Sequence, residues 1–410
     1  MSKKLYSVIS ALILAAVVLT ACAPAATYTP QMVEVTRIVE GTPKVVEITS
    51  TPAPTVAQPT EPQKPTNLPA GSIQINGAGA TFPLPVYTEW TYAYQYVDPS
   101  VAINYQGIGS GGGKKGIIDG TIDFAGSDSF LTDVEYTSGK DLQMYPILAG
   151  AIVPIYNIKF NLAKDAAAPT TTLILDRAAL VGIYNATITK WNDPAIAALN
   201  PDLQDVLPAA KITVVHRSDG SGTTEIFTKS LSAFSPDWKA GGASSVEWPV
   251  DKAGNGVGAK GNPGVAAAVL NTPNSIGYVE LSFATANSIA SAKLVNKAGK
   301  TVNANAASLT SAIIDFANTF SDKLTNTIVD GPGDGTWPIS GYTYLILHTS
   351  SMSDCTKAQK LLEYIRWSLT DPAAAKVAST LGYSVLPANV QKMVLAKLAA
   401  VTCSGSVVKK

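Results

Sequence analysis

After Gly71 the chain repeats one local pattern, in which a short apolar strand leads through a loop rich in Gly, Ser and Thr into an amphipathic helix. The strand candidates are residues 73–76, 101–105, 121–125, 147–156, 212–216 and 342–348. Apolar side chains at helical spacing begin at Val86, Ile226, Leu361 and Val390. Strands that alternate with helices in this way predict an α/β fold, with helices packed on a sheet.

The composition argues against several classes of function. The 410 residues include 30 basic and 30 acidic side chains, and no basic block offers the charged surface that nucleic-acid binding requires. Two histidines, His216 and His348, and three widely spaced cysteines are too few for a metal site of the usual His and Cys type. We therefore expect no nucleic-acid partner, no metal and no cofactor, with a carboxylate-only metal site as the alternative. The chain is long enough for two or three domains.

Residues 1–22 have the pattern of an export signal. Lys3 and Lys4 precede an apolar run that is too short for a good membrane-spanning helix, and residues 19–22 read Leu-Thr-Ala-Cys. This ending resembles a bacterial lipobox and predicts a lipoprotein cleaved before a lipidated Cys22; an ordinary signal peptide is the alternative. Lipidation would leave Cys355 and Cys403 as a pair outside the cytoplasm, where we predict a disulfide, with two free thiols as the alternative.

Residues 23–71 are predicted to form a tether. Residues 23–70 hold 9 Pro and 9 Thr in 48 positions, whereas residues 71–410 hold 17 Pro. Such a composition favours an extended, solvated chain that would hold a folded body away from the membrane.

Three loops carry glycine beside Ser or Thr where a strand candidate passes into a helix: residues 77–83, 107–113 and 217–223. Thr81 and Ser110 stand where a helix N-cap would stand, and Ser221 and Thr223 lie at a helix start. Helix N-termini attract anions through unpaired backbone N–H groups, and hydroxyls add further donors. Together the loops suggest one oxyanion site, although each alone has an ordinary steric explanation.

A fourth loop ends in a carboxylate, Asp128, at the end of residues 123–128. An ionised carboxylate only accepts hydrogen bonds, so it suits an anion that still carries a proton, such as hydrogen phosphate, and opposes sulfate. Arg217 is the cation that we expect at the site, because its planar fork suits a tetrahedral oxyanion. Asp219 would pair with Arg217, orient it and partly neutralise it. An Asx cap at Asp128 and a surface ion pair at Arg217 are the alternatives.

Taken together, these segments resemble the PstS family, the phosphate-binding proteins of the bacterial high-affinity phosphate ABC transporter. The resemblance runs from about Ile75 to the final helix. It rests on GAGATFPLPVY at 77–87, NYQGIGSGGG at 104–113, DFAGSD at 123–128, KWNDPAIAALNP at 190–201, VVHRSDGSGTTEIFT at 214–228 and IGYVE at 276–280.

The resemblance implies the residues that contact phosphate. They are Thr81, Phe82 through its backbone N–H, Ser110, Asp128, Arg217, Ser221, Gly222 and Thr223. Asp128 would accept the proton of the ligand, and Asp219 would pair with Arg217. Two positions beside the contacts depart from other family members, Gly111 where some have Ser and His216 where an Arg can stand.

The family fold is a two-lobe clamp of the periplasmic-binding-protein type, with two hinge crossings and the ligand cleft between the lobes. On this sequence it implies lobe one at 72–148 plus 336–410 and lobe two at 149–335. The expected protein is a monomer, anchored to the outer face of the cell membrane only through lipidated Cys22. It would deliver inorganic phosphate to the permease subunits of an ABC transporter and would not be an enzyme.

Four other functions are alternatives to this one. A hydrolase needs a Gly-x-Ser-x-Gly elbow, but Asp219 stands where the first Gly belongs. A nucleotide-binding P-loop fails because Lys115 follows Lys114 in place of Ser or Thr. A binding protein for another tetrahedral oxyanion is opposed by Asp128, and a sensor or adhesin built on the same clamp stays open.

Overall fold

The computed structural model describes residues 71–164 and 167–408. The predicted signal peptide with Cys22, and the predicted tether except Gly71, lie outside the described residues. Within the described part, none of the helices is both long and apolar enough to span a bilayer.

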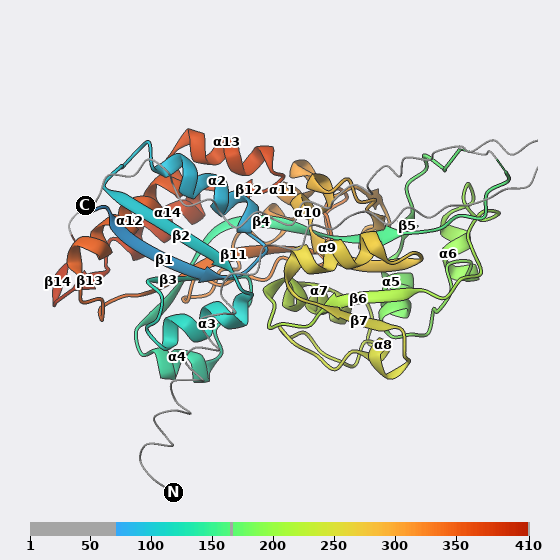
Figure 1. The fold of residues 1–410 in the computed structure, drawn as a ribbon, viewed down its shortest axis with the longest axis horizontal. Coiled ribbons are helices and arrows are strands. Elements are labelled where there is room, and N and C mark those ends of the chain that lie inside the picture. Colours follow the sequence, from blue (N-terminus) through green and yellow to red (C-terminus); the bar gives the residue numbers. More distant parts are fainter. Residues whose placement is uncertain (1–70, 165–166, 409–410) are drawn as a thin grey trace, which may run out of the picture. The chain divides into compact units, whose positions relative to one another are not determined.

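A nine-stranded mixed sheet organises these residues (Figure 1). The strands follow the order β2–β1–β3–β11–β4–β8–β6–β7, with β12 paired to β4. Their bounds are β1 (Ile73–Gly79), β2 (Val101–Gly107), β3 (Phe124–Ser127), β4 (Leu142–Asn157), β6 (Thr213–Arg217), β7 (Gly256–Ala259), β8 (Ser275–Glu280), β11 (Ser340–His348) and β12 (Ser384–Val385). Strands β1, β2 and β3 are parallel to one another, as are β6, β7 and β8, and the antiparallel strands β11 and β4 join the two groups.

Strand β4 belongs to both halves of the sheet. Its residues up to Ala151 pair with β11, and its residues from Ile152 onward pair with β8. All but two of its 16 residues are buried, as expected for a strand covered on both faces. Strands β1, β2, β3 and β11 fall in the range expected for lobe one, and β6, β7 and β8 in the range for lobe two. The fold is therefore a two-lobe α/β fold.

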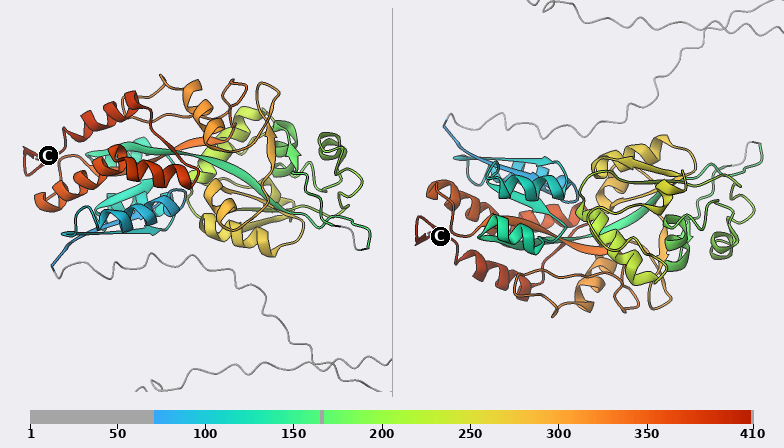
Figure 2. Two further views of the ribbon diagram at one scale, coloured as in Figure 1. Left: turned by 90° about the horizontal axis from the view of Figure 1, so that it is seen from above. Right: turned by 90° about the horizontal axis from the view of Figure 1, so that it is seen from below.

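Helices pack against both halves of the sheet. In lobe one α2 packs on β2, α3 on β1 and β3, α12 on β1, and α13 on α2; in lobe two α9 packs on β6 and β8, and α7 on β8 and α5. Both views of Figure 2 show the C-terminal helices, in red, beside the N-terminal strands, in blue. The two ends of the described chain thus build lobe one together.

The helix bounds are α2 (Leu84–Tyr94), α3 (Ser110–Ile118), α4 (Asp133–Gly139), α5 (Arg177–Tyr184), α6 (Pro194–Leu199), α7 (Gly222–Phe234), α8 (Pro249–Lys252), α9 (Gly261–Asn271), α10 (Leu281–Ala286), α11 (Ala306–Asp315), α12 (Cys355–Thr370), α13 (Pro372–Thr380) and α14 (Ala388–Leu398).

Two smaller sheets complete the fold. One has the strand order β10–β9–β5, and the other is a hairpin of β13 and β14. The bounds are β5 (Ile174–Leu175), β9 (Lys293–Val295), β10 (Thr301–Val302), β13 (Thr402–Cys403) and β14 (Ser406–Val407). Cys403 in this hairpin forms a disulfide with Cys355 at the start of α12, with their Cα atoms 5.5 Å apart.

The third strand begins later than the sequence pattern suggests. Residues 119–120 form a turn and residues 121–123 a bend, because Gly120 takes a positive φ of 69° after α3 and the Thr121 N–H bonds back to Gly116 O. The strand itself is Phe124–Ser127.

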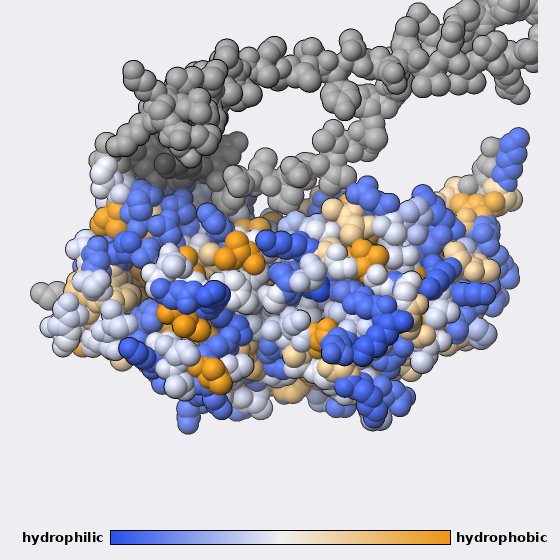
Figure 3. Space-filling model, turned by 60° about the horizontal axis from the view of Figure 1, so that its bottom comes forward, coloured by the Kyte–Doolittle hydropathy of each residue, from blue (hydrophilic) through white to orange (hydrophobic). Residues whose placement is uncertain are grey.

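On the face shown in Figure 3, apolar residues are scattered among polar ones and gather in no single large patch.

Candidate functional site

The candidate site lies at the carboxyl ends of parallel strands. In lobe one, Gly79 at the end of β1 stands opposite Gly107 of β2 and Gly126 of β3, so the three following loops leave the sheet side by side. In lobe two, β6 ends at Arg217, and residues 218–221 lead into α7. Ligands of open α/β sheets commonly bind at such strand ends.

The loops of the two lobes touch one another. The Gly111 N–H donates to Gly220 O at 2.9 Å, and the Gly222 N–H donates to Ser110 Oγ at 3.1 Å. The Asp128 N–H also donates to Ser110 Oγ, at 3.2 Å. The Ala80 N–H donates to Gly126 O at 2.8 Å and joins the first loop to the fourth, so the structure brings the predicted residues of all four loops to one place between the lobes.

Every side chain predicted to contact the ligand is buried there. Thr81, Ser110, Asp128, Arg217, Ser221 and Thr223 each expose 4% or less, and Phe82 exposes none. Burial of so many polar groups in one place strengthens each charge-assisted hydrogen bond that they make to a ligand.

Thr81 and Ser110 do not cap helices, so the capping interpretation is wrong for both. The residue before α2 is Pro83, and Thr81 Oγ1 instead accepts from the N–H of Asn262 in lobe two. Gly109 precedes α3, and Ser110 Oγ accepts from the N–H groups of Asp128 and Gly222. Contacts with distant loops displace the local capping that the sequence pattern suggests.

Ser221 does cap α7. Its Oγ accepts from the Thr224 N–H at 3.0 Å, and Gly222 and Thr223 form the first helical positions. The first N–H groups of a helix lack intrahelical partners, so this end of α7 directs hydrogen-bond donors toward lobe one.

Arg217 and Asp219 form a two-point ion pair. Arg217 Nε and Nη2 donate to the two carboxylate oxygens of Asp219 at 2.7 and 2.5 Å, and the side chain of Arg217 is 1% exposed. Asp219 also accepts from the Gly261 N–H at 3.0 Å. Burial alone would raise the pKa of Asp219, but the hydrogen bonds and charge of Arg217 hold it below its usual value. The guanidinium is therefore fixed in direction and largely neutralised.

Asp128 is the carboxylate placed among these donors. Its Oδ1 accepts from the hydroxyl of Thr343 on β11 at 2.8 Å. Burial raises the pKa of Asp128 to about 7, while the Thr343 hydrogen bond and the charge of Arg217 lower it. Near neutral pH, Asp128 can therefore accept a hydrogen bond when ionised or donate one when protonated.

Sequence reasoning missed two polar residues at the site, Thr343 and Asn262. Thr343 lies within a long apolar strand and has no local signal. Asn262, fully buried at the start of α9, binds the hydroxyls of Thr81 and Thr223. The sequence Gly261-Asn262-Pro263-Gly264, which begins α9 just after β7, is another Gly-containing passage from strand to helix of the type already described, and that signal could have revealed Asn262.

A second buried carboxylate, Glu280, lies at the end of β8. Its Oε2 accepts from the Tyr383 hydroxyl at 2.7 Å, and the same hydroxyl lies 2.6 Å from Phe82 O. Burial raises the pKa of Glu280 to about 8, against the hydrogen bonds from Ser282 and Tyr383. The Tyr383 hydroxyl thus links Glu280 to the backbone of residues 77–83, the first of the four loops.

Each histidine is held by a carboxylate side chain, and His216 Nδ1 also lies 3.1 Å from the backbone oxygen of Arg217. His216 Nε2 lies 2.8 Å from Asp251 Oδ1, and its ring stacks on Trp248. His348 Nδ1 lies 2.6 Å from Asp141 Oδ1. Among the described residues, no cluster of three or more His, Cys, Asp or Glu side chains is placed to hold a metal ion.

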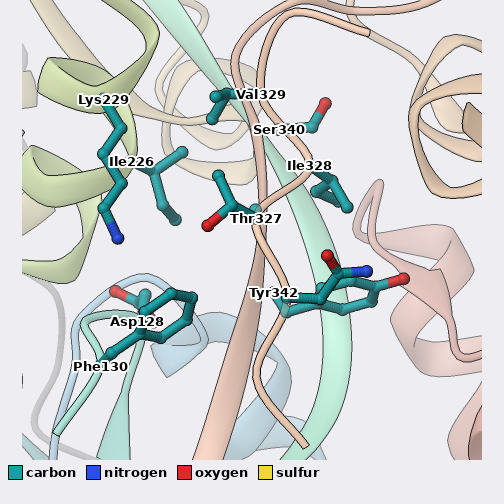
Figure 4. A pocket seen from close by; sticks show the side chains of 11 residues that line it. Asp128, Phe130, Ile226, Lys229, Thr327, Ile328, Val329, Ser340 and Tyr342 are labelled. Carbon is teal, nitrogen blue, oxygen red and sulfur yellow. The ribbon is translucent and has the colours of Figure 1, made fainter. Parts of the chain in front are cut away.

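A small pocket of about 10 Å³ lies beside Asp128 (Figure 4). Phe130 closes one side and Ile226 and Lys229 of α7 another, with Tyr342 of β11 across from them. Lys229 is paired with Glu225 at 2.7 Å and its Nζ lies 4.1 Å from the centre of the Phe130 ring. Asp128 is the one predicted ligand residue that lines this pocket, so the pocket lies at the edge of the candidate site. Its volume leaves room for about one water molecule.

The two-lobe fold, with the four predicted site loops between its lobes, is that of solute-binding clamps. The model of the PBP superfamily domain matches residues 49–372. The phosphate-binding protein PstS of Xylella fastidiosa is 38% identical over 327 residues, covering 79% of this chain and 84% of that protein. PstS of Methanocaldococcus jannaschii is 35% identical over 353 residues, covering 82% and 87%. The chain therefore belongs to the PstS family.

Solved structures agree on the fold. The periplasmic phosphate-binding protein PfluDING, bound with phosphate, aligns with a TM-score of 0.63 at 21% identity and covers 82% of this chain and 96% of its own. A phosphate-binding protein from Stenotrophomonas maltophilia aligns with a TM-score of 0.57 at 20% identity, covering 82% and 96%.

Proposed function

We propose that this chain is a binding protein that captures inorganic phosphate between its two lobes and delivers it to the permease subunits of an ABC transporter, without chemical conversion. Its membership of the PstS family and the phosphate named in its relatives support the ligand. The observation that carries the proposal is the buried Asp128 carboxylate, set among hydrogen-bond donors from both lobes.

The chemistry of hydrogen phosphate matches this mixed set. Three of its oxygens accept hydrogen bonds, and its hydroxyl donates one, for which Asp128 supplies the acceptor. Sulfate has no proton at neutral pH and would face Asp128 with a repelling oxygen. A site built around one required hydrogen bond rejects the analogue that lacks it by up to about 10⁴ to 10⁵ fold.

The proposed contacts come from both lobes. Lobe one supplies Thr81, the Phe82 N–H, Ser110 and Asp128; lobe two supplies Arg217, Ser221, Gly222 and Thr223, with Asp219 holding Arg217. The lobe boundaries that we propose are 72–148 plus 336–410 for lobe one and 149–335 for lobe two. Phosphate would then stabilise the closed arrangement of the lobes by its greater affinity for that state.

The lipobox pattern supports the location that we propose. Cleavage before Cys22 and lipidation would anchor a monomer to the outer face of the cell membrane, with residues 23–71 as the tether. Mass spectrometry of the membrane fraction should find a lipid-modified Cys22 at the mature N-terminus. An unmodified mature N-terminus would refute the anchor.

Calorimetry of the purified chain tests the ligand. Phosphate and arsenate should bind, and sulfate should compete at least about 10³ fold less well. Asp128→Asn, which can donate a hydrogen bond, should reduce the difference in affinity between phosphate and sulfate. Asp133→Asn, at the exposed start of α4, is the control for the loss of a negative charge. Equal competition by sulfate in the wild type would overturn the role of Asp128 and favour another oxyanion. Turnover of a phosphate ester that Ser221→Ala abolishes would point to a hydrolase.

A further inference from the structure

Asn262 makes an unusual set of contacts for a side chain outside the predicted ligand set. It is fully buried at the start of α9 in lobe two. Its Nδ2 lies 2.9 Å from Thr81 Oγ1 of lobe one and 3.0 Å from Thr223 Oγ1 of lobe two. Its backbone N–H donates to Thr81 Oγ1 as well, at 3.0 Å.

The orientation of this amide is fixed by a fourth hydrogen bond. The Glu280 N–H donates to Asn262 Oδ1 at 2.9 Å. An N–H group can only donate, so the atom facing it must be the amide oxygen, and the NH₂ group must face the two threonines. Both hydrogens of that NH₂ group are then donated to threonine hydroxyls.

This arrangement leaves each threonine hydroxyl able to make only one further hydrogen bond, as a donor. A hydroxyl has two acceptor lone pairs and one hydrogen to donate. Thr81 Oγ1 accepts from the backbone N–H and from Nδ2 of Asn262. Thr223 Oγ1 accepts from Nδ2 of Asn262 and, at 3.4 Å, from Nη1 of Arg217. Both oxygens have used their lone pairs, so each hydroxyl can only donate.

We propose that Asn262 is a positioning and specificity residue, which commits the hydroxyls of Thr81 and Thr223, one from each lobe, to donating hydrogen bonds to the bound anion. The inference rests on the proposed function. It also makes Asn262 a bridge between the lobes, because its bond to Thr81 exists only when the lobes are in contact.

Replacement by the nearly isosteric aspartate reverses this polarity. In Asn262→Asp, Oδ1 still accepts from Glu280, but the second oxygen accepts from the threonine hydroxyls and draws their hydrogens away from the ligand. In Asn262→Ala the hydroxyls are free to rotate and still donate. Aspartate also adds a negative charge beside the proposed anion, so a double-mutant cycle that adds no charge completes the comparison.

Phosphate affinity measured by calorimetry at neutral pH tests the inference. Asn262→Ala should weaken binding about tenfold, and Asn262→Asp at least about 100-fold, since hydrogen bonds to a charged ligand are each worth about 10 to 100 fold. Asn271→Asp, at the far end of α9, adds the same charge and should change affinity less than about threefold. Loss in Asn262→Asp equal to or smaller than that in Asn262→Ala overturns the inference.

A double-mutant cycle keeps the test decisive even if Asn262→Asp does not fold. Thr81→Val should cost at least about threefold less affinity in the Asn262→Ala background than in the wild type, because the hydroxyl is no longer held as a donor. Strictly additive effects would contradict the inference. If the wild type itself fails to bind phosphate, the proposed function fails; if it binds and only the order of the variants is wrong, the inference alone fails.

Discussion

The hydroxyl of Thr343 donates a hydrogen bond to Oδ1 of Asp128 at 2.8 Å, between residues 215 positions apart in the chain. Strand β11 pairs with β3, and its pairing with β4 shifts register between Thr343 and Tyr344. A hydroxyl that donates to a carboxylate stabilises the ionised form and restrains its orientation. Thr343 thereby favours the ionised form of this buried acid.

Thr343→Val should raise the pKa of Asp128 further, because burial is then opposed by one hydrogen bond fewer. A protonated Asp128 has lost its charge, so it is a weaker acceptor for the hydroxyl of the proposed ligand. The acid side of the pH profile for phosphate affinity should therefore move up by about one pH unit, and affinity near pH 7 should fall about tenfold. Calorimetry from about pH 5 to about pH 9 measures both.

Thr343→Ser keeps the hydroxyl and is the matched control, so its profile should overlay that of the wild type. Superimposable profiles for the valine variant and the wild type would show that Thr343 has no influence on Asp128.

Gly222→Ala tests whether contact between the lobes is needed for binding. A Cβ on Gly222 would lie 2.4 Å from Asp128 Cβ and 2.5 Å from the backbone N of Ser129, closer than such atoms approach. These neighbours belong to lobe one, so the clash arises only when the lobes meet. Phosphate affinity should fall at least about 100-fold, while the melting temperature without phosphate changes by less than about 3 °C.

Small-angle scattering with and without phosphate completes this test, since the variant should lose any phosphate-induced compaction. Gly264→Ala on α9 is the control, because its added Cβ comes no closer than 3.6 Å to its neighbours. An unchanged affinity in Gly222→Ala would mean that the lobes need not meet as the structure has them.

The sequence predicts the loops of the site but not the contacts between them. Gly and Ser after apolar runs mark the strand ends, and Ser221 caps α7 as its local pattern suggests. Thr81 and Ser110 show the same local pattern but do not cap helices, because residues distant in the sequence donate hydrogen bonds to their oxygens. Thr343 could not be found, since its contact with Asp128 depends on the pairing of strands that are remote in sequence.

Asp219→Asn should make phosphate binding sensitive to salt. In the wild type the two-point pairing with Asp219 largely cancels the charge of Arg217, so long-range attraction of the anion is weak. Without that cancellation, the association rate measured by stopped flow should fall at least about threefold between about 20 and about 300 mM salt, against less than about 1.5-fold in the wild type.

Asp237→Asn removes an exposed carboxylate of lobe two and serves as the charge control, for which wild-type salt dependence is expected. Equal salt dependence in all three proteins would mean that Asp219 does not neutralise Arg217.

Glu280→Gln should remove part of the pH dependence of stability. Burial raises the pKa of Glu280 to about 8 in the folded protein, whereas in the unfolded chain the group titrates near 4.5. Between these values the folded state holds a proton that the unfolded state has released. The free energy of unfolding therefore falls as pH rises from about 4.5 to about 8, and this contribution is level above and below that window.

Thermal melts in phosphate-free buffer measure this contribution. Between about pH 5 and about pH 8 the wild type should lose on the order of 5 °C more in melting temperature than Glu280→Gln, and the two should approach one another at the acid end. Glu247→Gln, in which an exposed carboxylate is replaced, should follow the wild type. Parallel curves of melting temperature against pH for the wild type and Glu280→Gln would mean that Glu280 is ionised throughout this range. Tyr383 and Ser282 would then stabilise a buried charge next to the backbone of Phe82.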